Sequence, residues 1–157
     1  FADKILLKRF LTLKVLSKSS EYGLRALLYM VGKNSEQEYV SIREMSEALD
    51  ISFHFLTKIL QSLTQANLLI SYRGPNGGVA FNTPPDKILL SDVVRVLEGD
   101  DFFDTCLLGL PGCGESVPCP MHQFWGKIRG ELKHEFETTS LAEMGQTALL
   151  GRLRLMP

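Results

Sequence analysis

The fold of this chain is decided by residues 41–82, SIREMSEALDISFHFLTKILQSLTQANLLISYRGPNGGVAFN. Its first letters, SIRE at 41–44, form a capping box, which predicts a helix that directs Ile42, Met45 and Leu49 inward. The stretch DIS at 50–52 predicts a tight connection and places Ser52 at the N-cap of the next helix. That helix has apolar residues at the spacing i, i+3, i+4 and i+7, namely Leu56, Ile59, Leu60 and Leu63. Two amphipathic helices joined in this way predict a helix-turn-helix.

The second helix is followed by a change of period from helix to strand. Asn67 suits a left-handed helix end, and Leu68–Arg73 and Val79–Asn82 are strand candidates on either side of GPNGG at 74–78. The pair Asn76-Gly77 predicts a type I′ hairpin turn, because both central positions of that turn need positive φ. Helices followed by a two-stranded hairpin predict a winged helix-turn-helix.

Further helices are predicted on both sides of this stretch. The helix before it ends near Gly32 and Asn34 and has an apolar face formed by Leu24, Leu27, Leu28 and Val31. The helix after it is capped by Ser91, and its apolar face is formed by Leu90, Val93, Val94 and Leu97. A longer helix runs from about Met121 to Glu137 with a stripe of Trp125, Ile128, Leu132 and Phe136. Such a stripe needs a partner, either the winged domain or a second copy of the helix.

The composition is that of a core-forming protein. Of the 157 residues, 45% are hydrophobic and 22% are charged, which excludes intrinsic disorder and collagen-like repetition. No apolar run approaches the ~18 residues that a membrane helix needs, so no membrane partner is expected. The net charge of −1 divides into +3 over residues 1–75 and −4 over residues 76–157, and the mildly basic first part allows contact with an anionic polymer.

One side of the second helix suits contact with DNA. Opposite the apolar stripe lie polar residues that can read bases or phosphates, namely His54, Thr57, Lys58 and Gln61, with Ser52 at the helix start. In the hairpin, Arg73 precedes a rigid glycine-rich tip that contains Asn76, and an arginine at such a tip can enter a narrow minor groove. The competing interpretation is a plain three-helix bundle with a solvated face, followed by an ordinary β-turn.

All three cysteines fall in the Gly- and Pro-rich segment before the last helix. The spacing is Cys106-x6-Cys113-x5-Cys119-x2-His122. An odd number of cysteines does not suit a disulfide scaffold, so a reducing compartment and a cytoplasmic location are expected. Thiolates and an imidazole bind zinc or iron, and the lack of a Cys-x2-Cys knuckle favours ligands spread around an iron–sulfur cluster. Zinc and three idle thiols are the alternatives. No catalytic motif occurs, so no enzyme activity is expected.

Together these segments resemble the bacterial iron–sulfur cluster regulators of the IscR/NsrR type, which are winged-helix transcription repressors. The resemblance covers roughly residues 13–144. Its carriers are LSKSSEYGLRAL at 16–27, Ile51-Ser52 with Leu56, RGPNGG at 73–78, LSDVV at 90–94, LEG at 97–99, CPMH at 119–122 with Trp125, and TSLA at 139–142.

The resemblance implies a homodimer, joined through the last helix, that binds palindromic promoter DNA. It also implies a [2Fe-2S] or [4Fe-4S] cluster on the three cysteines and a fourth ligand. In isc-type members this ligand corresponds to His122, and in some nitric-oxide-sensing members it is an acidic residue of the partner subunit that corresponds to Glu21. We favour His122 and a [2Fe-2S] cluster, because imidazole suits that centre. The first cysteine gap has six residues where the best-known members have five, and Thr57 stands where isc-type members commonly have Glu, so neither the cluster type nor the operator sequence is carried over.

The sequence thus predicts a mostly α chain with a small β-hairpin, in which a winged helix-turn-helix domain precedes a long C-terminal dimerisation helix. The expected parts are an N-terminal extension (1–13), the winged domain (14–86), the cluster-binding loop with the dimerisation helix (87–141) and a C-terminal tail (142–157). The predicted function is a dimeric DNA-binding repressor whose iron–sulfur cluster senses redox state, nitric oxide or iron–sulfur status. A zinc-bound or cluster-free regulator of the same fold and a cluster-carrying interaction or electron-transfer protein are the alternatives.

Overall fold

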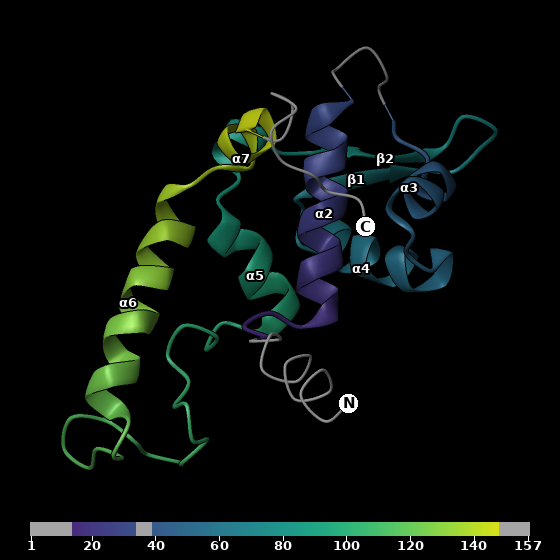
Figure 1. The fold of residues 1–157 in the computed structure, drawn as a ribbon. Coiled ribbons are helices and arrows are strands. Elements are labelled where there is room, and N and C mark those ends of the chain that lie inside the picture. The colour runs from purple at the N-terminus through teal and green to yellow at the C-terminus, as the bar shows by residue number, and fades with distance from the viewer. Residues whose placement is uncertain (1–13, 34–38, 148–157) are drawn as a thin grey trace, which may run out of the picture.

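The computed structural model describes residues 14–33 and 39–147, which form helices and one small hairpin at one side of the molecule (Figure 1). In chain order the elements are α2 (Lys18–Gly32), α3 (Ile42–Leu49), α4 (Phe53–Gln65), β1 (Leu69–Tyr72), β2 (Gly78–Phe81), the short 3-10 helix η1 (Pro85–Lys87), α5 (Leu90–Glu98), α6 (His122–Thr138) and α7 (Leu141–Thr147). This confirms the predicted mostly α fold with a small β-hairpin. The expected extension at 1–13 and the predicted helix stop at Asn34 lie outside the described residues.

The helix-turn-helix consists of α3 and α4, and the predicted apolar stripe of α4 is buried. Between the helices Asp50 adopts a left-handed conformation with φ 52°, which reverses the chain within a short connection. Only one of the two hydrogen bonds of the predicted capping box forms. Ser41 Oγ accepts a hydrogen bond from the N–H of Glu44 (3.4 Å), but the Glu44 carboxylate accepts from Tyr29 Oη (2.8 Å) and pairs with Lys33 instead of returning to the N-cap. Glu44 therefore fastens α3 to the end of α2.

The hairpin turn differs from the type I′ turn that the sequence predicts. Neither Asn76 nor Gly77 has a positive φ. Instead, the Gly77 N–H donates to the carbonyl of Gly74 (3.0 Å), so Pro75 and Asn76 are the central residues. The reason is proline, whose fixed φ near −65° suits the first central position of a type I turn. We call β1, β2 and residues 73–77 the wing.

The wing is joined to the chain just before α3. Val40 and Val79 exchange backbone hydrogen bonds of 2.8 and 3.0 Å. A Cβ atom at the neighbouring Gly78 would lie only 2.1 Å from the carbonyl oxygen of Val40, so this close approach requires glycine. The hairpin is thus held at a fixed place beside the helix-turn-helix.

Helix α5 begins two residues earlier than it would if Ser91 were its N-cap. The N-cap is Leu89, whose N–H donates to the carboxylate of Asp92 (2.9 Å). Ser91 lies inside the helix with 1% of its surface exposed, and its hydroxyl has no hydrogen-bond partner. The prediction of Ser91 as the cap is therefore wrong, because an acidic residue at the third helical position stabilises the helix start without it.

Helix α6 packs against α5, and α7 packs against α2, the first helix of the described residues. In Figure 1, α6 lies at one side of the molecule, and its 17 residues include none that is fully buried. Its attachments to α5 include an ion pair between Arg95 and Glu137 (2.6 Å). Helix α7, which occupies the start of the expected tail at 142–157, packs against α2, and Leu141 is fully buried.

None of the helices in the described ranges is long and apolar enough to cross a membrane.

Candidate nucleic-acid interface and metal centre

A groove between α4 and the wing is the candidate nucleic-acid interface. It has a volume of about 710 Å³, and its lining includes Thr57, Gln61 and Arg73 from the predicted set. Gln61 and Arg73 are exposed, whereas the Thr57 hydroxyl donates to the carbonyl of Phe53 within α4 (2.7 Å). The groove therefore presents an amide and a guanidinium, groups that bind base edges and phosphates.

The remaining predicted contact residues do not line this groove. Ser52 and His54 are exposed at the start of α4, and Lys58 is exposed near its middle. The side chain of Ser52 makes no capping hydrogen bond. Its hydroxyl is thus positioned like those that bind phosphates at helix starts. Asn76 lines an adjacent cavity of about 750 Å³ with Tyr39 and Tyr72, so the structure does not bring it into the groove itself.

Arg43 is a groove residue that the sequence reasoning missed. It is exposed on the first turn of α3, and its guanidinium lies 5.2 Å from the ring centroid of Phe53, the first residue of α4. Both residues line the groove. An arginine stacked on an aromatic ring keeps its charge while losing conformational freedom. The only sequence signal that could have indicated Arg43 was its positive charge in α3, the helix that precedes α4.

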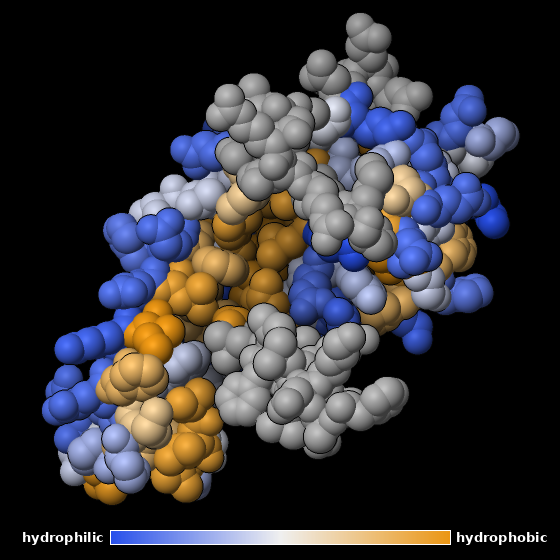
Figure 2. Space-filling model, viewed as in Figure 1, coloured by the Kyte–Doolittle hydropathy of each residue, from blue (hydrophilic) through white to orange (hydrophobic). Residues whose placement is uncertain are grey.

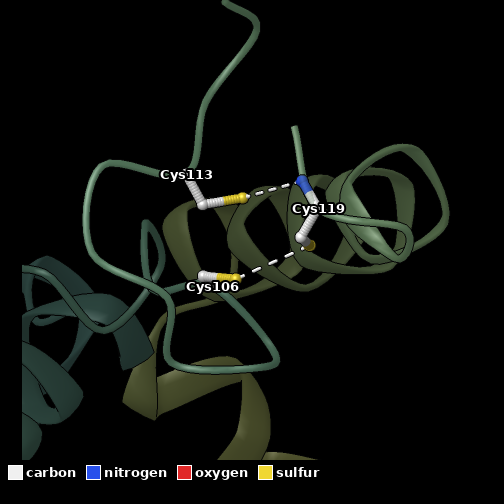
Figure 3. Close-up of side chains that lie close together, drawn as sticks. All are labelled: Cys106, Cys113 and Cys119. Carbon is white, nitrogen blue, oxygen red and sulfur yellow. Dashed lines mark hydrogen bonds between the residues drawn. The ribbon is translucent and has the colours of Figure 1, made fainter. Parts of the chain in front are cut away.

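The three cysteines converge, as predicted from their spacing. Their Sγ atoms all lie within 4.8 Å of one another, and Cys106 Sγ is 3.7 Å from Cys119 Sγ (Figure 3). The backbone N–H of Cys119 donates to Cys113 Sγ (3.4 Å). His122 lies beside this group, with its Nδ1 3.4 Å from Cys113 Sγ. Among the described residues, no other set of three His, Cys, Asp or Glu side chains is grouped in this way.

The electrostatics of the loop favour a thiolate at one position. Backbone N–H groups of Leu110 and then Leu108, together with the neighbouring thiols, lower the pKa of Cys106 to about 7. The N–H of Cys119 favours the Cys113 thiolate, but burial and the two nearby thiols outweigh it and raise the pKa of Cys113. Metal binding would replace the remaining protons, since thiolates are the metal-binding form.

The donor set fits a metal ion or an iron–sulfur cluster. Three soft sulfur ligands converge in a partly buried loop, and amide N–H groups point at sulfur, as is typical of cluster sites. We define residues 99–120 as the cysteine loop.

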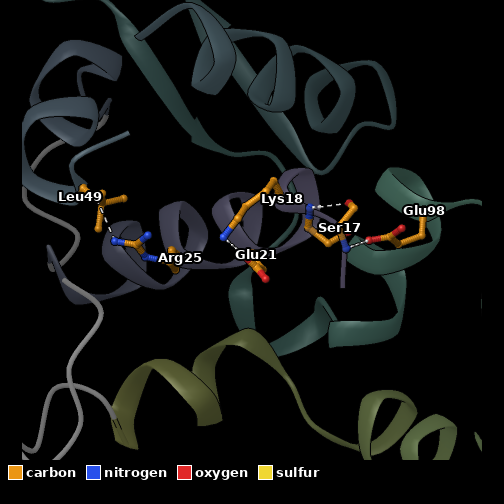
Figure 4. Close-up of polar contacts among 7 residues, drawn as sticks. Ser17, Lys18, Glu21, Arg25, Leu49 and Glu98 are labelled. Atoms are coloured by element: carbon orange, nitrogen blue, oxygen red, sulfur yellow. Dashed lines mark hydrogen bonds and ion pairs between the residues drawn. The ribbon is translucent and has the colours of Figure 1, made fainter. Parts of the chain in front are cut away.

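Glu21 lies on α2 and does not join this group within one chain. Its carboxylate pairs with Lys18 Nζ at 2.5 Å, near the N-terminus of the helix (Figure 4). At the same end of α2, the carboxylate of Glu98 accepts from the N–H of Ser17 (2.7 Å). Glu21 therefore lies in the first turn of α2 and is not part of the cysteine group of its own chain.

The fold and the two sites define a winged-helix DNA-binding regulator with a thiol ligand site. Comparison with known proteins gives the family. Residues 16–147 match the Rrf2 family, described as iron-dependent transcriptional regulators, and the chain belongs to that family. Membership confirms the expected winged-helix transcriptional regulator and confirms that the protein is not an enzyme.

Individual relatives agree with this assignment. The chain is 35% identical over 106 residues to the HTH-type transcriptional regulator NsrR of Oceanobacillus iheyensis, which covers 62% of this chain and 71% of that protein. The structure is similar to CymR (YrzC), the global cysteine regulator of B. subtilis, with a TM-score of 0.71 and 26% identity over 87% of this chain and 98% of that chain. It also shares the fold of T. potens IscR, with a TM-score of 0.68 and 23% identity over 88% and 91% of the two chains.

Proposed function

We propose that this protein is a dimeric transcriptional repressor whose affinity for DNA is controlled by an iron–sulfur cluster bound to Cys106, Cys113 and Cys119. The observation that carries the proposal is the convergence of these three thiols within 4.8 Å, in a family described as iron-dependent. The similarity to NsrR of Oceanobacillus iheyensis also supports a cluster.

The fourth ligand is proposed to be His122. Its Nδ1 lies 3.4 Å from Cys113 Sγ. His122 is the first residue of α6 and follows Cys119 by three residues. Glu21 is the alternative and would have to be supplied by the partner subunit. When bound, the cluster supplies iron that responds to redox state and nitric oxide, while the chain supplies the thiolates and the N–H groups that stabilise them.

The proposed DNA contacts divide by chemistry. Arg43, Lys58 and Arg73 supply positive charge for phosphates or the minor groove, and Gln61 is placed to read a base edge. Ser52 and His54 lie at the start of α4, Thr57 lines the groove, and Asn76 lines the adjacent cavity. Two such faces related by a twofold axis would read a palindromic promoter site.

Dimerisation is proposed to use α6. Phe124 and Ile128, which are four residues apart, are 58% and 41% exposed, and Figure 2 shows apolar residues along the side of α6 that is turned toward α5. A second copy of the helix would cover this face, and a twofold interface of this kind is the commonest in soluble oligomers.

Helix α2 is the element that would link the cysteine loop to the DNA-binding face. At its start, Ser17 donates to Glu98, which immediately precedes the cysteine loop. Further along, Arg25 donates to the carbonyl of Leu49 (2.8 Å) at the end of α3 (Figure 4). A change in the loop that moved Glu98 would therefore reach the helix-turn-helix through one rigid helix.

A zinc-bound regulator is the second candidate, and the set of three thiols and one imidazole supports it. Two thiolates on one tetrahedral zinc lie about 3.8 Å apart, given a Zn–S distance of about 2.3 Å. Cys106 and Cys119 match that value at 3.7 Å, and with Cys113 and His122 they would supply the four ligands of a tetrahedral zinc ion.

Anaerobic purification with iron, sulfide and zinc counts and a visible spectrum tests the proposal. The cluster predicts equal iron and sulfide with a broad visible band. One zinc per chain without colour supports the second candidate. Absence of metal from protein purified anaerobically, and after reconstitution with iron and sulfide, overturns both.

A further inference from the structure

The segment that carries Cys106 is fastened to α6 by two side chains. The indole Nε1–H of Trp125 donates to the carbonyl of Thr105 (2.9 Å), and the Arg129 guanidinium donates to the carbonyls of Asp104 (2.9 Å) and Thr105 (3.2 Å). Trp125 and Arg129 are four residues apart and so lie on one face of α6. We call these two residues the α6 clamp. They hold the backbone directly before the first cysteine.

The residues before Thr105 are ordered as well. Phe103 is 2% exposed, and its ring lies edge-on to Phe136 of α6 at 5.9 Å. The Thr105 hydroxyl donates to the carbonyl of Asp101 (2.9 Å). Cys106 therefore follows a stem that is packed against α6 at one end and hydrogen-bonded to it at the other.

The other cysteines differ in how firmly they are held. The carbonyl of Cys119 accepts the N–H of His122 (3.0 Å), so Cys119 is joined to the start of α6. Cys113 lies in the middle of a segment whose large apolar side chains are exposed, namely Leu107, Leu108, Leu110 and Val117. Two of the three thiols are thus anchored to one helix, and the third is carried by a more exposed part of the loop.

We propose that Trp125 and Arg129 are positioning residues for the metal centre. By holding Thr105, they keep Cys106 Sγ 3.7 Å from Cys119 Sγ, so that α6 presents a preformed pair of sulfur ligands and Cys113 completes the site. Ligands that are oriented by neighbouring hydrogen bonds bind metal more tightly because less order is lost on binding. This inference rests on the proposed metal centre, and it adds that the same helix that is proposed to form the dimer also assembles the ligands.

The test compares the full-length protein with Trp125→Phe, which keeps a ring but loses the N–H, and with Arg129→Met. Arg129→Lys keeps one donor and a charge, and Lys127→Met removes an exposed cation of α6 as a matched control. Each protein is reconstituted anaerobically with ferrous iron and inorganic sulfide, and loss of visible absorbance is followed after addition of EDTA. In parallel, iodoacetamide labelling of each metal-free protein is resolved by cysteine, and circular dichroism verifies the helices.

We expect cluster loss about tenfold faster in Trp125→Phe and Arg129→Met, in line with the effect of removing groups that orient metal ligands. Arg129→Lys should be intermediate, and Lys127→Met should match the unaltered protein. Labelling should accelerate at Cys106 and not at Cys113. A structural defect alone would accelerate labelling at all three cysteines, and that result overturns the inference.

Variants that keep both the cluster lifetime and the Cys106 labelling rate of the unaltered protein also overturn the inference while leaving the proposed centre intact. If the unaltered protein acquires no visible band, the proposed cluster fails instead. In that case the labelling of the metal-free proteins tests the positioning role of Trp125 and Arg129. Faster labelling at Cys106 alone supports this role, and an unchanged labelling rate overturns it.

Discussion

Arg43 and Arg73 come from different elements and line one groove, so single substitutions should separate phosphate contact from base reading. We expect Arg43→Ala, Lys58→Ala and Arg73→Ala each to weaken binding to a mixed-sequence duplex and to lower the salt slope by about 1. Gln61→Ala should instead alter the sequences selected from a random pool. Lys87→Ala, an exposed cation of η1 that does not line the groove, is the control. If the salt dependence of DNA binding is unchanged in all three cationic variants, the groove between α4 and the wing is not the DNA-binding face.

The fourth ligand is also decided by single residues. His122→Ala should leave a labile cluster with a shifted spectrum, because His122 already lies beside Cys113 in the same chain. Glu21→Ala should leave the spectrum nearly unchanged, since Glu21 pairs with Lys18 on α2. Visible absorption after anaerobic reconstitution is the measurement. A colourless Glu21→Ala protein beside an unaltered His122→Ala protein would reverse the assignment.

Between elements, the attachment of α3 to α2 depends on the charge of one carboxylate. The ammonium of Lys33 and then the hydroxyl of Tyr29 hold the pKa of Glu44 below its ordinary value. A lowered pKa in the folded state stabilises the fold above the ordinary carboxyl pKa, and this contribution is lost as the pH falls through the folded pKa. Thermal unfolding of Glu44→Gln should therefore show a smaller loss of stability on acidification than the unaltered protein. Because Glu44 is partly exposed, the effect should be modest, and parallel acid profiles would contradict it.

Features that depend on neighbouring residues within one element could be predicted from the sequence, whereas contacts between elements could not. Periodicity predicted the buried stripe of α4, and Asn67 ends that helix with φ 60°, because both depend on neighbours within a turn or two. The hairpin turn was misplaced because Pro75 fixes a conformation that competes with the Asn76-Gly77 signal. Arg43 could not be assigned to the groove, since its stacking on Phe53 depends on how α3 and α4 cross. The cysteine spacing predicted that the three thiols converge. The hydrogen bonds of Trp125 and Arg129 to the loop could not be predicted, because they depend on where α6 lies relative to residues 104 and 105.

Across the whole molecule, the cysteine loop and the DNA-binding face lie far apart in Figure 1, and α6 extends along the side that carries the loop. If α6 joins two subunits, a charge on its exposed apolar face should separate them. We expect Ile128→Glu to shift the protein from dimer to monomer in sedimentation velocity and to weaken binding to duplex DNA. Gln123→Glu adds the same charge at an exposed position of α6 and should remain dimeric. A monomeric unaltered protein, or a dimeric Ile128→Glu protein, would contradict an interface on this helix.

The central claim is that the centre at the cysteine loop controls DNA affinity, and one comparison tests it most directly. Duplexes selected from a random pool are titrated, at one fixed salt concentration, with the cluster-loaded protein and with the same preparation after its metal is removed. We predict affinities that differ by at least about tenfold, equivalent to a coupling of about 1.4 kcal/mol between the two sites. The difference should vanish in a Cys106→Ala protein that remains folded. Equal affinities of the loaded and metal-free forms would contradict the account.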